Sequence, residues 1–137
     1  MHSVYCLLCR LKCSSTKNLK KQLMKVTTMK RTKIKFDEYQ KKAFTTACST
    51  AINSAYMVAG LAGEAGEVAG RFAKMIRDGD SDEQRELLRK ELGDVLWFVA
   101  GTATLYGWSL DDIAQDNLAK LFDRKERGVI QGNGDIR

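Results

Sequence analysis

The chain has 137 residues, which suits one domain, and its 44% of hydrophobic residues supply enough apolar material to exclude wholesale disorder. It has no proline and little alternation of apolar and polar residues, so we expect an all-α fold. The uncharged stretch 95–110 is too short and too polar to span a membrane. The net charge of +6 does not indicate nucleic-acid binding by the folded part, because the excess comes from one end of the chain.

That end is the segment 1–35, which differs sharply in composition from the rest of the chain. It carries ten basic residues and no acidic one, whereas 36–137 carries 13 basic and 17 acidic residues. We interpret 1–35 as a basic, disordered extension and 36–137 as the single folded domain. Two origins remain open for the extension: it belongs to the natural protein, or the natural start is Met29. Contact of the extension with nucleic acid or anionic lipid is a further alternative.

Three of the four cysteines, Cys6, Cys9 and Cys13, lie in this extension, and Cys48 lies in a predicted helix. The extension does not resemble a signal peptide, because its apolar run is short and its positive charges come after that run. We therefore expect free thiols and a cytoplasmic protein. A zinc site built from the three cysteines and His2 is an alternative, although structural zinc sites normally have a second closely spaced pair of ligands.

Two helices are predicted in the first half of the domain. The first covers about 37–52, where apolar residues recur on one helical face. The second covers about 55–76 and ends at the sequence Asp-Gly-Asp at 78–80, which is a strong helix breaker.

Two more helices are predicted in the second half, each preceded by a serine that can cap it. Ser81 predicts a third helix that continues to Tyr106, and Ser109 predicts a fourth helix that continues to Arg127. Gly128 then fits the left-handed residue that commonly comes after a helix end.

Two acidic pairs lie in the second and third predicted helices. Glu64 and Glu67 occur in GLAGEAGEV, and Glu91 and Asp94 occur in ELGDVLW, so the members of each pair share one helical face. Counted at 3.6 residues per turn, Glu64 and Glu91 fall inside the apolar stripe of their helices, and Asp94 falls at the edge of its stripe. Ordinary solvated carboxylates avoid that location, because an unpaired buried charge is costly.

The two pairs are also equally far from the predicted turn. Gly79, at the centre of this turn, lies midway between them, so an antiparallel hairpin would bring all four carboxylates to the same height. A hard divalent cation such as Mg²⁺ would neutralise them and keep waters for substrate phosphates. The alternative is that they are surface pairs bridged to neighbouring arginines or lysines. A di-iron bundle is disfavoured, because the single histidine is His2.

With these motifs the chain resembles a known family. Residues from about 36 to 137 are similar to the MazG-like all-α nucleoside triphosphate pyrophosphohydrolases, through GLAGEAGEV, through ELGDVLW after a charged turn, and through the pattern N-x-x-K-x-x-x-R. The resemblance implies a four-helix bundle with a central antiparallel hairpin, assembled as a homodimer or a dimer of dimers. It also implies hydrolysis of a nucleoside triphosphate, with non-canonical and deoxy nucleotides among the candidates, to monophosphate and pyrophosphate. Mg²⁺ is the implied cofactor and Mn²⁺ a substitute.

The resemblance assigns the metal-binding and catalytic role to the four acids Glu64, Glu67, Glu91 and Asp94. The first motif of the family usually begins with two adjacent glutamates, but the first of these positions is Gly63 here. This departure concerns a residue that is not one of the four matched ligands. It keeps open the alternative of a catalytically silent helical interaction module with the same fold.

The resemblance also indicates residues that bind the substrate. Lys120 and Arg124 match residues that meet the triphosphate, and Asn117 lies one turn before them. These residues form a stripe on the fourth predicted helix, which would bind polyphosphate if it faced the metal site. By itself the stripe is equally consistent with a solvated face. Gln40 lies where similar proteins approach the nucleobase.

Overall fold

The computed structural model describes residues 33–132, and this part of the chain is all helical, as predicted. Expectations about the residues before 33 lie outside the described part. No helix within 33–132 combines the length and apolar character that a membrane crossing requires. The elements in chain order are α3 (Phe36–Phe44), the short 3₁₀ helix η2 (Ser49–Ala51), α4 (Ser54–Asp78), α5 (Asp82–Leu105) and α6 (Leu110–Glu126).

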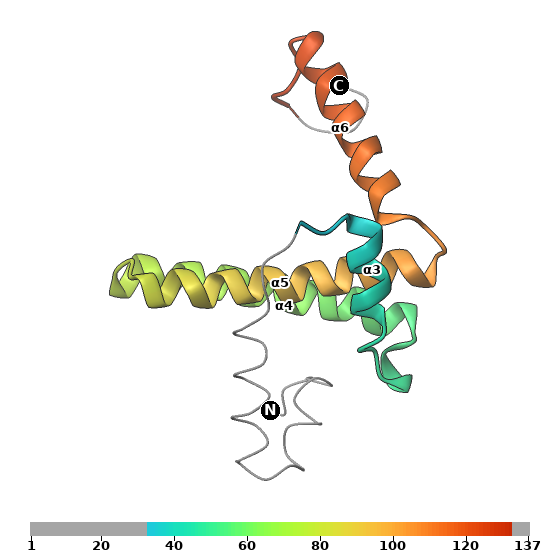
Figure 1. Ribbon diagram of the computed structural model, residues 1–137. Helices are drawn as coiled ribbons and strands as arrows, with labels where there is room; N and C mark the ends of the chain where they lie inside the picture. The colour runs from blue at the N-terminus through green and yellow to red at the C-terminus, as the bar shows by residue number, and fades with distance from the viewer. Residues whose placement is uncertain (1–32, 133–137) are drawn as a thin grey trace.

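The helices α4 and α5 form the predicted antiparallel hairpin and lie side by side over most of their length (Figure 1). The polar residue before each helix holds its first turn: Asn53 accepts a hydrogen bond from the backbone N–H of Tyr56, and Ser81 accepts one from that of Gln84. Such caps satisfy backbone N–H groups that have no partner inside the helix. Both helices of the hairpin begin and end within two residues of the predicted bounds.

Close packing of the hairpin depends on two glycines near its open end. A side chain at Gly60 would overlap the ring of Phe98, and one at Gly101 would come within 2.7 Å of the sulfur of Met57. Met57 and Phe98 are both buried and belong to one apolar cluster. Glycine thus lets large side chains of each helix occupy the space that a Cβ on the other helix would take.

The helix α3 packs across α5 and is shorter than predicted, because it ends at Phe44 instead of about residue 52. Just beyond its end, the hydroxyls of Thr45 and Thr46 donate to the carbonyls of Lys42 and Ala43 (2.7 Å each). Local hydrogen bonds of this kind compete with continuation of a helix.

Cys48 consequently lies outside any α-helix, at the residue before η2.

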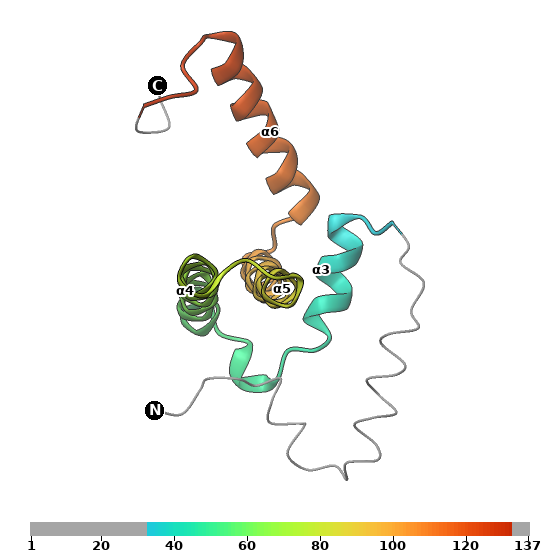
Figure 2. The same cartoon turned by 90° about the vertical axis from the view of Figure 1, so that its left-hand side faces the viewer.

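The last helix, α6, extends away from the hairpin (Figures 1 and 2). Ser109 caps it as predicted, accepting from the backbone N–H of Asp112 at 3.1 Å, and Gly128 comes after its end with a φ of 69°. It packs near its own first turn, against α3 and, through Leu110, against Ala100 and Ala103 of α5. Four α-helices and the hairpin are confirmed, and α6 leaves the hairpin instead of lying along it.

Candidate metal centre

Three of the four predicted acids meet between α4 and α5. One carboxylate oxygen from each of Glu64, Glu67 and Glu91 lies within 4.8 Å of the others. Glu64 and Glu91 are buried, as their position in the apolar stripes predicted, and Glu67 is exposed. Solvent therefore reaches the group on the side of Glu67, whereas Glu64 and Glu91 are covered by the protein.

Glu64 is the most unusual of these acids. Glu64 is 7% exposed, and its buried Oε2 atom has no hydrogen-bond partner within the described part of the chain. Burial raises the pKa of Glu64 to about 7, and the negative charges of the neighbouring carboxylates add to this effect. A carboxylate held this way is costly in its charged form and would be stabilised by a cation.

Asp94, the fourth acid, lies beside the group. Its charge contributes to the raised pKa of Glu64. The pKa of Asp94 is itself raised by burial and by the charges of Glu91 and Glu67. On α3, burial and, to a smaller extent, the charge of Asp94 raise the pKa of the Tyr39 phenol.

A cation that the sequence analysis did not identify already touches one of the acids. Arg71 of α4 donates from its Nε to Oε1 of Glu91 across the hairpin, at 3.0 Å. For Glu91, the alternative that an arginine neutralises the acid is therefore correct in this structure. The sequence could have predicted this contact. Arg71 lies four residues after Glu67 and seven after Glu64, so it shares their helical face.

A hollow of about 300 Å³ opens directly beside this ion pair. Its lining includes Glu67, Arg71 and Lys74, so it offers two cationic side chains next to one of the gathered acids. Gly66 and Gly70 complete the lining, and a Cβ at either position would meet no atom within 4 Å. The hollow is thus open, and its charges suit an anion that also contacts the acid group.

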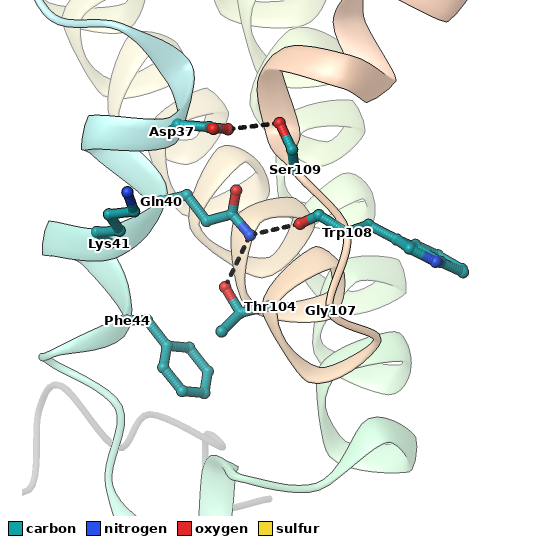
Figure 3. A pocket seen from close by; sticks show the side chains of 8 residues that line it. All are labelled: Asp37, Gln40, Lys41, Phe44, Thr104, Gly107, Trp108 and Ser109. Carbon is teal, nitrogen blue, oxygen red and sulfur yellow. Dashed lines mark hydrogen bonds between the residues drawn. The ribbon is translucent and has the colours of Figure 1, made fainter.

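Gln40, the residue expected near the nucleobase, is buried at the junction of three helices (Figure 3). Its Nε2 donates to Oγ1 of Thr104 (3.1 Å) and to the carbonyl of Trp108 (2.9 Å). Its Oε1 accepts from the backbone N–H of Leu110 (2.9 Å). Both amide hydrogens are therefore used within the protein, and Gln40 joins α3 to the connection between α5 and α6.

A pocket of about 460 Å³ lies at this junction (Figure 3). Thr104 is ten residues beyond Asp94 on α5, which corresponds to about 15 Å along the helix. The pocket is thus well separated from the acid group. Its lining consists of Asp37, Gln40, Lys41, Phe44, Thr104, Gly107, Trp108 and Ser109.

The other predicted substrate residues lie on α6. Asn117 and Lys120 are exposed and line a shallow hollow of about 320 Å³, and Arg124 is buried. Because α6 extends away from the hairpin, the structure does not bring these three residues to the acid group of the same chain (Figure 2).

Comparison with known proteins identifies relatives of this chain. The family model described as the MazG nucleotide pyrophosphohydrolase domain matches residues 53–129, a range that contains both acidic pairs and the stripe on α6. The "Gene 37 protein" of Mycobacterium phage L5 is 46% identical over 93 residues, which cover 66% of this chain and 82% of that protein. No solved structure matches the chain.

Proposed function

This chain belongs to the MazG nucleotide pyrophosphohydrolase domain family, and on that premise we propose that it hydrolyses a nucleoside triphosphate to the monophosphate and pyrophosphate, using Mg²⁺ or, as a substitute, Mn²⁺. The substrate is a standard, deoxy or modified nucleotide. We further propose that it acts in the cytoplasm.

One observation carries this proposal: the buried Oε2 of Glu64, without a hydrogen-bond partner in the described part of the chain, belongs to a carboxylate that gathers with Glu67 and Glu91. Such an oxygen is expensive to bury unless something binds it. The donor set consists of oxygens only, which suits Mg²⁺ and Mn²⁺ and disfavours softer metals. The residues present therefore fit the ion that the family implies.

In the proposed reaction, Glu64, Glu67 and Glu91 would hold the metal ion, with Asp94 beside them. When bound, Mg²⁺ supplies neutralisation of phosphate charge and activation of a water for attack at the α-phosphorus. Burial and the charges of Glu91 and Glu67 raise the pKa of the half-buried Asp94.

Position 63, where the family usually has a glutamate, is Gly63 here and is not one of the three gathered acids. We therefore assign the metal ion to Glu64, Glu67 and Glu91 without a residue at position 63.

The remaining substrate contacts would come from α6 in an oligomer. Lys120 and Arg124 would bind the triphosphate and the leaving pyrophosphate, with Asn117 one turn before them. We propose a homodimer or a dimer of dimers in which α6 of one copy packs on the hairpin of the other. In support, α4 and α6 expose large apolar side chains, among them Ile76 (73% exposed) and Phe122 (58% exposed).

A panel of standard, deoxy and damaged nucleoside triphosphates tests the proposal. We expect Mg²⁺-dependent release of pyrophosphate from at least one of them, and loss of release when EDTA is added. If the folded protein binds Mn²⁺ but turns over no member of the panel, the alternative of a silent helical interaction module is correct.

A further inference from the structure

The ion pair between Arg71 and Glu91 has a consequence beyond the proposed function, on which it rests. We infer that Arg71 is an exchangeable counter-cation: its guanidinium holds Glu91 while the metal ion is absent, and gives up this carboxylate when the ion binds. The released guanidinium then binds substrate phosphate in the adjoining hollow. Arg71 is thus a substrate-binding residue that also sets the affinity of the site for metal.

The geometry of the pair supports exchange. Glu91 is buried at 8% exposure, so without a cation its charge would be poorly stabilised. Arg71 approaches it from the open side of the site, and 30% of its side chain remains exposed. The guanidinium can therefore leave Glu91 for solvent without crossing the protein interior.

Charge repulsion supplies the reason for exchange. Glu91 belongs to the carboxylate group whose oxygens lie within 4.8 Å of one another, and Arg71 Nε is 3.0 Å from one of its oxygens. A divalent ion placed among these oxygens would lie only a few ångströms from the guanidinium, at a distance where like charges repel strongly in a partly buried site. Arg71 therefore competes with the ion for Glu91.

After it leaves Glu91, the guanidinium of Arg71 can bind an anion in the hollow of about 300 Å³ beside the ion pair. Its lining contains Arg71 itself and, one turn further on α4, the exposed Lys74. A triphosphate bound there would meet the two cations and Glu67, one of the gathered acids. Arginine suits this role, because its fork of N–H groups binds phosphate oxygens in pairs.

The test measures Mn²⁺ binding to the full chain without nucleotide, by electron paramagnetic resonance. Arg71→Met removes the charge and keeps much of the apolar stem. We expect it to bind Mn²⁺ roughly three- to tenfold more tightly than the wild type, because the competitor is gone. The matched control is Arg77→Met, on the same helix, where the arginine pairs with Asp78 at the surface. It should change the affinity by less than about twofold.

Thermal unfolding provides an independent readout. Without metal, Arg71→Met should unfold at a lower temperature, because Glu91 is left buried without a partner. Added Mn²⁺ should then stabilise this variant more than it stabilises the wild type. Arg71→Gln also removes the charge and should likewise bind Mn²⁺ more tightly than the wild type, which keeps the test decisive if the methionine variant folds poorly. Arg71→Lys keeps the charge and should resemble the wild type in Mn²⁺ affinity.

The second half of the inference predicts an effect of opposite sign. With Mn²⁺ saturating, binding of inorganic tripolyphosphate should be about tenfold weaker in Arg71→Met and unchanged in Arg77→Met. Tighter metal binding together with weaker tripolyphosphate binding supports the inference.

Each other result overturns it in a recognisable way. If Arg71→Met binds Mn²⁺ equally or less tightly than the wild type, Arg71 only orients Glu91, and the proposed function stands. If tripolyphosphate binding is unaffected, Arg71 does not bind phosphate. If neither the wild type nor any variant binds Mn²⁺, the metal centre of the proposed function fails together with the inference.

Discussion

The side-chain oxygen of Gln40 accepts a hydrogen bond from the backbone N–H of Leu110, the first residue of α6, at 2.9 Å. This bond joins residues 70 positions apart and satisfies an N–H group in the first turn, which no intrahelical carbonyl can reach. Asp37 acts in parallel, since its Oδ1 accepts from the hydroxyl of Ser109 (2.8 Å) and the backbone N–H of Asp111 (3.0 Å). The first helix of the domain thereby caps the last.

Replacing Gln40 by leucine should destabilise the protein. The substitution leaves the buried N–H of Leu110 and the carbonyl of Trp108 without their partner, which costs about 1–3 kcal/mol in the free energy of unfolding. Urea denaturation followed by circular dichroism measures this. Gln115→Leu, the same change at an exposed position of α6, is the control and should have little effect. Equal stability of the two variants would contradict the anchoring role of Gln40.

Glu91→Gln should abolish Mg²⁺-dependent hydrolysis and leave the helices folded. The substitution keeps the shape of the side chain and removes one metal-binding charge, so the barrier should rise by at least ~3 kcal/mol. Turnover and far-ultraviolet circular dichroism are measured together. Glu83→Gln, an exposed residue in the first turn of the same helix, controls for the charge change. Near wild-type turnover of Glu91→Gln would rule out the acid group as the active centre.

The stability of the metal-free protein should fall as the pH rises from about 5 to 8. Burial raises the pKa of Glu64 from 4.5 to about 7, so between these values the folded state binds more protons at this residue than the unfolded state. Folding therefore becomes less favourable as the pH rises through that interval. Melting temperatures in EDTA measure the trend. Glu64→Gln should flatten it, and an unchanged slope in this variant would show that Glu64 is not the group responsible.

Saturating Mg²⁺ should oppose the same trend in the wild type. The ion binds the deprotonated carboxylate, so its stabilising effect should be larger at pH 8 than at pH 6. Equal stabilisation at the two pH values would argue against Glu64 as a ligand.

Removal of residues 1–28 should leave hydrolysis intact. The predicted active residues all lie after this segment, which carries no acidic residue that could join the metal centre. Turnover of the shortened and full-length proteins with the same nucleotide measures this. A folded but inactive shortened protein would assign a role to the segment. Zinc near one ion per full-length chain would instead support a site at Cys6, Cys9 and Cys13.

The protein should be a dimer or tetramer at micromolar concentration. A domain of about 100 residues in helices buries only ~60–65% of its unfolded surface, so the exposed apolar faces of α4 and α6 need a partner. Static light scattering decides this. Phe122→Glu on α6 should weaken the assembly, and a wild-type protein that is monomeric and active would refute the proposed exchange of α6.

Several features could be predicted from local sequence because the forces that produce them act over a few residues. A serine before an amphipathic run is enough to begin α5 and α6, and apolar spacing is enough to place Glu64 and Glu91 inward. The equal distances of the acidic pairs from Gly79 depend on residue spacing alone. These local rules were sufficient for the hairpin and for the gathering of Glu64, Glu67 and Glu91.

Other features were decided only by contacts between distant residues. The indole of Trp97 donates to the carbonyl of Ala43 and the hydroxyl of Thr46. These contacts lie where α3 ends, although the apolar pattern of the sequence continues beyond this point. Gln40 is committed to Leu110, and Arg71 reaches Glu91 across the hairpin. Residue spacing was thus enough to locate the two helices of the hairpin and the acids that face inward. The partner of each buried polar group could not be read from it, because that partner depends on which helices pack together and at what height.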